Sequence, residues 1–312
     1  LDLLEDAVKI RMQCDAPYGA YLSGGVDSTS VVTLMSKQLS APVKTFCLGY
    51  EDKAEGQFAG KEQDIYYART MSQRLGTEHF EYIISAKQFA EQMPEIMSAF
   101  DEPFSGAVST FFLSILIKKH VKVALSGDGA DELFGSYLAH RLAFSVESYL
   151  QLISCGRKDW RDLDQKDKES IHPFDTPEQF SFLKNIASND VAKWRGRLSV
   201  FSHDERGQLL TKEFLHAGGY SDINDIYRDI ASQLTAKDAL NKSLEIDQKE
   251  LLPNQVLPFV DRLSMAHSIE VRVPYLDYRI VEFANRLSGK FKIRNGINKY
   301  IHKIIRVSKK LF

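Results

Sequence analysis

The chain has 312 residues, of which 44% are hydrophobic and 26% charged, as in an ordinary globular protein. Its net charge of −2 gives no basic surface for RNA or DNA, so we expect no nucleic-acid partner, although this does not exclude a tRNA-modifying enzyme. No signal peptide or membrane-length apolar run occurs, and Cys14, Cys47 and Cys155 lack a zinc or disulfide spacing, so we expect a cytoplasmic protein without a membrane partner.

The N-terminus carries an apolar stripe at helical spacing from Leu1 to Met12, with charged residues opposite. This pattern predicts a short amphipathic helix that packs on a sheet.

A polar, glycine-rich stretch follows at Ser23–Ser28 (SGGVDS), between an apolar run that ends at Leu22 and a pattern of helical period. It predicts a strand, a turn and a helix. Gly24 and Gly25 let the backbone approach a ligand closely, the N–H groups of the first helical turn lack intrahelical partners, and the two serines add hydroxyl donors. The stretch therefore favours phosphate binding, although a capped Gly-Gly turn without a ligand is the structural alternative.

Asp27 is unusual in a phosphate loop because a bare carboxylate repels phosphate. A Mg²⁺ ion shared between the two would remove that repulsion. The chain contains neither the Walker A pattern nor the dinucleotide fingerprint G-x-G-x-x-G.

Strand and helix patterns alternate after this loop. We expect strands over residues 43–50 and 79–85, helices over residues 62–75, 86–99 and 109–120, and a loop over residues 52–60. This alternation predicts a doubly wound α/β fold, with a parallel sheet and helices on both faces.

A second glycine-rich turn, SGDGADELFG at residues 126–135, follows the apolar run of residues 121–125. Ligands bind beyond the carboxyl ends of parallel strands, so the two turns can face one site although they lie far apart in the sequence. The carboxylates of Asp128, Asp131 and Glu132 suit a metal ion or a developing positive charge. The alternative is an acidic helix N-terminus that is stabilised by the helix dipole.

The second half of the chain shows helical periods instead of strand signals. Residues 158–168 are charge-rich and residues 171–177 contain two prolines, so we expect a surface linker or an insert there. We divide the chain into an α/β region at 1–145 and a mainly helical region at 146–312.

A third block, VDRLSMA at residues 260–266 followed by EVRVPYLD at residues 270–277, completes a recognisable order of motifs. The three blocks together resemble the synthetase domain of glutamine-dependent asparagine synthetases, which belong to the PP-loop ATP pyrophosphatase (adenine nucleotide alpha hydrolase-like) superfamily. The resemblance covers nearly the whole chain, and it implies that the α/β region at 1–145 binds ATP and that the helical region at 146–312 completes the amino-acid site. The related β-lactam and carbapenam synthetases share mainly the first block.

The resemblance implies ATP and Mg²⁺ as cofactors, adenylation of aspartate to β-aspartyl-AMP with release of pyrophosphate, and amidation by ammonia. It places the nucleotide and its pyrophosphate on a set of residues in the first half of the chain: Tyr21, Ser23, Gly24, Gly25, Asp27, Ser28, Leu48, Ser126 and Gly127. Asp27 and Asp131 are the expected metal ligands. Asp128 is the expected catalytic carboxylate, with Glu132 as a second candidate.

Asp261, Arg262 and Arg272 could bind the α-groups of aspartate, but ion pairs that secure helix packing explain them equally well. An asparagine-synthetase-like ligase acting on another acid is the alternative function, and a tRNA-modifying PP-loop enzyme is a more distant one. A nucleotide-binding module without catalysis is a further alternative.

The family's complete enzymes begin with a glutaminase domain whose nucleophile is an N-terminal cysteine, whereas this chain begins at Leu1. We therefore expect a piece of a longer protein whose glutaminase domain is a partner, and we allow for a homodimer. The family's phosphate-contacting Arg-x-Lys segment would lie beyond Phe312, so we expect only weak, ammonia-dependent activity from the chain alone.

Overall fold

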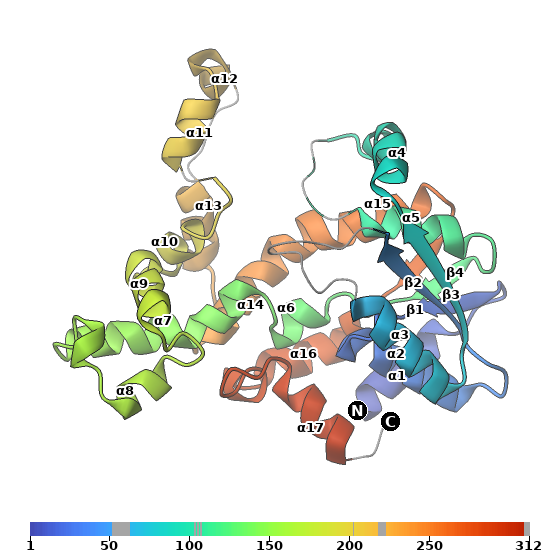
Figure 1. Ribbon diagram of the computed structural model, residues 1–312, viewed down its shortest axis with the longest axis horizontal. Coiled ribbons are helices and arrows are strands. Elements are labelled where there is room, and N and C mark those ends of the chain that lie inside the picture. The colour runs from blue at the N-terminus through green and yellow to red at the C-terminus, as the bar shows by residue number, and fades with distance from the viewer. Residues whose placement is uncertain are drawn as a thin grey trace. The chain divides into compact units, whose positions relative to one another are not determined.

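The computed structural model describes residues 1–51, 63–102, 104, 106, 108–201, 203–217 and 223–308 (Figure 1). The chain forms two compact units. Unit 1 comprises Leu1–Ala130, Glu250–Ala284 and Ile301–Phe312, and unit 2 comprises Asp131–Lys249 and Asn285–Tyr300. The functional division at residue 145 stays a prediction, because compactness alone does not test it.

Unit 1 is built on a parallel sheet of five strands in the order β3-β2-β1-β4-β5. The strands are β1 (Tyr18–Tyr21), β2 (Lys44–Tyr50), β3 (Glu78–Ile84), β4 (Val123–Leu125) and β5 (Glu270–Arg272). Ala20 of β1 is paired with Thr45 on one side and Leu125 on the other, so β1 is the central strand from which the sheet is wound in both directions. The predicted doubly wound parallel fold is confirmed.

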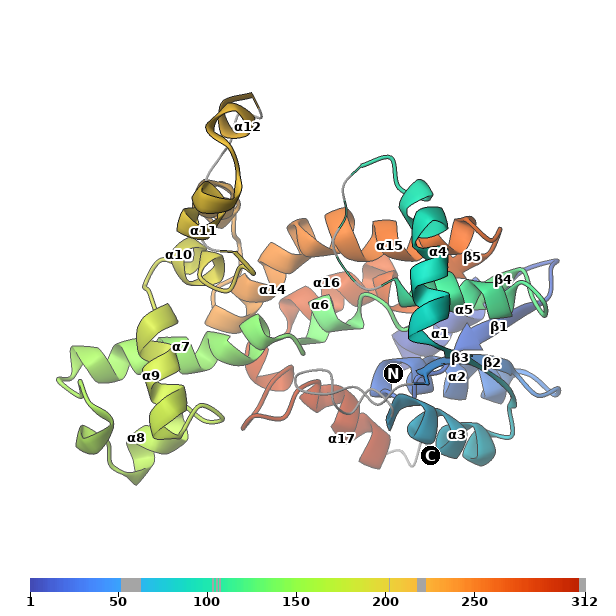
Figure 2. The same ribbon diagram turned by 45° about the horizontal axis from the view of Figure 1, so that its top comes forward.

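Helices cover both faces of this sheet (Figures 1 and 2). Helices α1 (Asp2–Arg11), α2 (Val26–Gln38) and α3 (Gln63–Leu75) pack in sequence on one face, and α5 (Ser109–Ile117) packs with α15 (Leu257–Met265) on the other. The remaining helices assigned mainly to this unit are α4 (Ala86–Ser98), the π-helical turn η3 (Leu252–Val256), η4 (Pro274–Leu276), α16 (Tyr278–Arg286) and α17 (Tyr300–Ser308).

The core of unit 1 joins the sheet to α5. Phe46 and Ala124 are fully buried against Ile117, and a neighbouring cluster places Phe111 against Leu263 of α15. All residues of β4 are buried, as expected of a strand covered on both faces. This packing fixes the carboxyl ends of β1 and β4 beside each other.

Unit 2 is helical, as its sequence predicted. After α6 (Ala130–Phe134), its elements are α7 (Leu138–Ser154), η2 (Trp160–Asp162), α8 (Gln165–Ser170), α9 (Pro177–Ile186), α10 (Val191–Gly196), α11 (His203–Leu209), α12 (Lys212–Ala217), α13 (Ile223–Ser232), α14 (Ala239–Lys249) and η5 (Gly289–Phe291). Of the two alternatives predicted between residues 158 and 177, a surface linker or an insert, the surface linker is wrong. Leu163, Ile171 and Phe174 are buried in one apolar cluster with α7 and α9.

The structure adds a strand at residues 270–272 and leaves the expectation for residues 52–60 untested. Residues 270–272 form the edge strand β5, which the sequence showed only as an extended segment. The loop predicted at residues 52–60 lies outside the described residues. Within the described ranges, no helix combines the length and the apolar character of a membrane span.

Candidate functional site

The SGGVDS stretch connects β1 to α2 at the centre of the sheet. Gly25 is the N-cap of α2 and has no side chain with which to cap the helix, so the first-turn N–H groups are left without a side-chain partner at this position. The Ser23 and Ser28 hydroxyls hydrogen-bond with each other at 3.0 Å, and the Ser28 hydroxyl also accepts the Ser23 amide at 3.3 Å. These contacts close the loop into a compact turn whose open face consists of backbone N–H groups at a helix N-terminus, as an anion site requires.

Gly24 cannot be replaced without strain. Its φ is +75°, and an added Cβ would lie 2.3 Å from Cβ of Tyr67 in α3. A side chain here would meet both the left-handed backbone and the covering helix, so the loop conformation depends on glycine.

The second glycine-rich turn lies directly against the first. A Cβ on Gly127 would stand 2.8 Å from the amide nitrogen of Ser28 and 2.9 Å from Cβ of Asp27. The two motifs, about a hundred residues apart in sequence, therefore meet at the switch point between β1 and β4. This is the position at which doubly wound sheets bind ligands.

Three of the expected nucleotide-contacting residues come from neighbouring strands: Tyr21 ends β1, Leu48 lies in β2 and Ser126 follows β4. Ser126 is buried, and its amide donates to the Arg272 carbonyl at 2.9 Å. Burial raises the pKa of the Tyr21 phenol, which therefore stays protonated, and the Asp128 charge acts in the same direction. Leu48 packs against two core clusters, which supports the packing alternative for this residue beside the ligand one.

Asp27 lies in the first turn of α2, and its Oδ1 is 3.6 Å from Nδ1 of His302 in α17. The His302 ring stacks on buried Tyr275 with centroids 5.5 Å apart. The carboxylate is therefore held at the glycine loop with an imidazole beside it.

Asp131 and Glu132, the two acidic residues of the second turn that follow Asp128, lie in unit 2. Oδ1 of Asp131 is 2.5 Å from Nζ of Lys299 and also accepts the Ser136 hydroxyl. Lys299 is buried and has a φ of +52°, an uncommon conformation for a residue with a side chain. The Asp131 side chain is 35% exposed, so its carboxylate stays within reach of a ligand.

Glu132 is fully buried and accepts the Tyr137 hydroxyl at 2.6 Å. Burial raises its pKa to about 7, against which the Tyr137 hydrogen bond acts only in part. The second catalytic candidate is thus a desolvated carboxylate that is hydrogen-bonded to Tyr137.

The third block supplies contacts that hold elements together. Arg262 is 2.7 Å from Asp101 and 3.2 Å from Glu102. Arg272 donates to the carbonyls of Arg11 and Gln13 at the end of α1. These contacts support the packing alternative for both arginines, and a role in substrate binding stays a prediction, as it does for exposed Asp261.

The donor set fits Mg²⁺ bound together with a nucleotide. Mg²⁺ prefers carboxylate oxygens and commonly takes one or two of them with substrate phosphates. Among the described residues, no group of three or more His, Cys, Asp or Glu side chains is placed to hold a metal ion. A single carboxylate such as Asp27 or Asp131 would therefore share Mg²⁺ with waters and substrate phosphates.

Sequence reasoning missed the groups that hold the two acidic turns. His302 and Lys299 showed no signal beyond a helical pattern, because their partners lie more than 160 residues away. Tyr137 follows Glu132 by five residues, a spacing that could have suggested a local contact across the turn after α6.

Comparison with known proteins identifies what the motifs resemble. The sequence matches the family described as asparagine synthase over residues 1–305. It is 31% identical over 306 residues to asparagine synthetase (glutamine-hydrolyzing) 1 of Bacillus subtilis (strain 168), covering 96% of this chain and 45% of that protein.

Two further relatives have the same kind of name. The putative asparagine synthetase (glutamine-hydrolyzing) of Mycobacterium tuberculosis (strain ATCC 25618 / H37Rv) is 29% identical over 306 residues, which cover 96% of this chain and 43% of that protein. The Homo sapiens asparagine synthetase (glutamine-hydrolyzing) is 30% identical over 156 residues, covering 46% of this chain and 26% of that protein. The chain spans less than half the length of the relatives that match it over 306 residues.

Proposed function

Because the chain belongs to the asparagine synthase family, we propose that it activates the side-chain carboxylate of aspartate with ATP and then amidates it with ammonia. The contact of Gly127 with Asp27 and Ser28 supports this most directly, since it joins a phosphate loop to an acidic turn. An amide ligase acting on another carboxylic acid is the alternative. The sequence similarity favours aspartate.

The residues of the glycine loop have the first task. The N–H groups of the first turn of α2, with the Ser23 and Ser28 hydroxyls, bind the β- and γ-phosphates that leave as pyrophosphate. Ser126 and Gly127 bind the adenylate part. Bound Mg²⁺ would neutralise the leaving pyrophosphate, with Asp27 and Asp131 as its proposed protein ligands.

The second step needs a proton acceptor. The substrate carboxylate attacks the α-phosphorus and forms an acyl-adenylate. Ammonia then adds to the acyl carbon and AMP leaves with the electron pair of the broken C–O bond. The nitrogen is positively charged until it loses a proton, and we assign Asp128 to stabilise that charge or accept the proton, with Glu132 as the second candidate.

An ATP–pyrophosphate exchange assay across carboxylic acids tests the first step, and amide formation with ammonium chloride tests the second. Exchange should require aspartate and Mg²⁺. Asp27→Asn and Asp131→Asn should each reduce exchange roughly a hundredfold or more, since a metal ligand contributes several kcal/mol. The same change at exposed Asp15 is the matched control.

Asp128→Ala should slow amide formation more than it weakens ATP binding. If pyrophosphate exchange occurs with another acid only, that acid and not aspartate is the substrate. If no acid supports exchange, the proposed ligase function is contradicted. Near-normal exchange in Asp27→Asn would remove this residue from the metal site.

The full-length protein is proposed to receive its ammonia from a glutaminase part, as the names of its relatives suggest for them. A cytoplasmic location and a homodimer remain parts of this proposal. Gel filtration of the purified full-length protein would test the assembly.

A further inference from the structure

A chain of polar contacts runs through the interior of unit 2 and ends at Asp131. It starts at Arg195 of α10, which donates to Asp247 of α14 and to the Ser243 hydroxyl at 3.1 Å. The other oxygen of Asp247 is 2.8 Å from Nε2 of His140 in α7. Arg195 is 8% exposed, Asp247 2% and His140 0%, so these contacts lie out of water.

The direction of the hydrogen bonds follows from the backbone. The Ser136 amide can only donate, and it points at Nδ1 of His140 at 3.2 Å, so Nδ1 must be the unprotonated nitrogen. Burial lowers the pKa of His140, which keeps the ring neutral, and its remaining proton sits on Nε2 and is donated to Asp247. Asp247 therefore selects the tautomer that can accept the Ser136 amide.

Ser136 is the residue through which this chain reaches the acidic turn. Its amide is bound by His140, its carbonyl accepts the Asn298 side chain at 3.4 Å, and its hydroxyl donates to Oδ1 of Asp131. The residue after Asp247, Gln248, donates to the Glu132 carbonyl at 3.0 Å. Helix α14 therefore holds the segment from Asp131 to Tyr137 at two points.

We propose that Arg195, Asp247 and His140 are positioning residues, which fix the Asp131 carboxylate for Mg²⁺·ATP by holding the backbone of Ser136. The inference rests on the proposed role of Asp131 in the function above. A buried network of this kind needs every member satisfied, and His140 meets this condition with both ring nitrogens. Among the described residues, the hydrogen-bonded link from these three residues to Asp131 runs through Ser136.

The first experiment uses hydrogen–deuterium exchange on the whole chain without nucleotide. His140→Leu removes both ring contacts, whereas His140→Gln keeps an acceptor and a donor on its amide. Amide exchange in the segment 131–137 should become roughly threefold to tenfold faster in His140→Leu and change less in His140→Gln. Unchanged exchange in His140→Leu would overturn the proposal.

The second experiment measures the affinity for Mg²⁺·ATP by thermal protection, and the KM and the saturating rate by pyrophosphate exchange. His140→Leu and Ser136→Ala should each weaken Mg²⁺·ATP binding roughly threefold to tenfold with a nearly unchanged saturating rate. The double variant should be no weaker than the more affected single variant, because both changes act on the same link. Leu163→Ala, in the apolar core of the same unit, is the control that loses stability without touching this network.

Fully independent effects in the double variant, or unchanged affinity in Ser136→Ala, would overturn the proposal. Ser136 is only partly buried, so Ser136→Ala can still be used to test the proposal if His140→Leu does not fold. Absence of Mg²⁺·ATP protection in the unaltered chain would instead contradict the proposed function. The hydrogen–deuterium exchange experiment would still decide whether the network holds the segment 131–137.

Discussion

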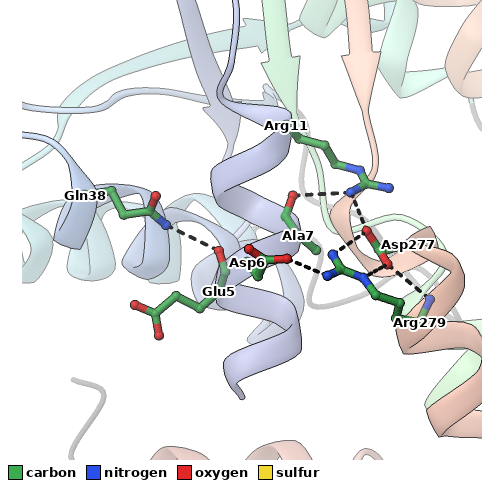
Figure 3. Close-up of polar contacts among 7 residues, drawn as sticks. All are labelled: Glu5, Asp6, Ala7, Arg11, Gln38, Asp277 and Arg279. Atoms are coloured by element: carbon green, nitrogen blue, oxygen red, sulfur yellow. Dashed lines mark hydrogen bonds and ion pairs between the residues drawn. The ribbon is translucent and has the colours of Figure 1, made fainter.

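Two buried carboxylates, one in each unit, bind arginine in different surroundings. Asp277 in unit 1 accepts Arg11 of α1 at 3.1 Å and Arg279 of α16 at 2.9 Å, and Arg279 continues to Asp6 at 2.6 Å (Figure 3). Asp247 in unit 2 has one arginine and one neutral histidine. The first group joins two helices of unit 1, and the second holds a segment of the candidate site.

The difference lies in the water around the cations. The side chains of Arg11 and Arg279 are 22% and 32% exposed, whereas that of Arg195 is 8% exposed. A cation that keeps water can be hydrated when its partner is lost, but a dry one cannot. Removal of the carboxylate should therefore lower the free energy of unfolding by different amounts in the two groups.

The largest effect is expected at Asp247. Asp247→Asn leaves the Arg195 charge buried without a counter-charge, which should lower the free energy of unfolding by about 3 to 5 kcal/mol. Urea denaturation measures the change. Replacing both partners, Arg195→Met with Asp247→Leu, should recover part of the loss, and a double variant as unstable as the single one would contradict this explanation.

A smaller effect is expected at Asp277. Asp277→Asn weakens charge-assisted hydrogen bonds and should cost about 1.5 to 3 kcal/mol in the same assay. Arg279→Lys, which keeps the charge but loses the paired donors, is the companion variant. A loss equal to that of Asp247→Asn would mean that exposure of the arginines does not matter.

The pH dependence of stability sharpens the case of Asp277. Hydrogen bonds from Arg279 and then Arg11 hold the pKa of Asp277 well below its ordinary value. Its stabilisation is therefore complete above the unfolded pKa of about 3.9 and is lost as the pH falls through the lower folded value. Unfolding between about pH 4 and 2 should be steeper in the unaltered chain than in Asp277→Asn, and parallel profiles would contradict this.

Lys292 in unit 2 provides the opposite case, a buried cation whose Nζ has no hydrogen bond among the described residues. Burial lowers its pKa from 10.5 to about 8, so the unfolded chain binds more protons between these values and stability should rise with pH there. Lys292→Met should add about 1 to 2 kcal/mol at pH 7 and remove this rise. A destabilised Met variant would indicate that the ammonium has a partner in solution.

The smallest effect is expected at an exposed pair in unit 1. Arg69 donates to Glu81 through two hydrogen bonds of 2.6 and 2.7 Å, but the Arg69 side chain is 59% exposed. Water screens such a pair, so Arg69→Gln should unfold at nearly the same urea concentration as the unaltered chain. A clear shift of the urea midpoint would mean that an exposed ion pair stabilises the chain as the Asp277 group does.

Local patterns were sufficient for strands β1 to β4 and for the two glycine-rich turns. The glycines and serines of SGGVDS and the apolar runs beside them predicted a strand, a phosphate loop and a helix, and the structure has β1, the turn and α2 there. The helix begins at Val26, earlier than the apolar period showed, because Gly25 already acts as the N-cap. The asparagine synthase resemblance, read from three motifs, is confirmed by the family match.

Other parts of the fold had no local signal. Residues 270–272 are too few to show a strand period, and they become β5 only because β4 offers a free edge. The charged and proline-containing stretch around Ile171 resembled a linker, yet three apolar residues spaced along it are buried by α7 and α9. A few apolar residues within a polar stretch can be identified as core residues only when the element that covers them is known.

The sequence by itself determined the winding of the sheet, the two glycine-rich turns and the family, because strand periods, turn residues and motif order are local properties of the chain. The tertiary structure alone decided which buried polar and charged groups are paired. Lys299 meets Asp131 and His140 meets Asp247 across separations of 168 and 107 residues. Such pairing depends on which groups folding removes from water together, and no window of sequence records this.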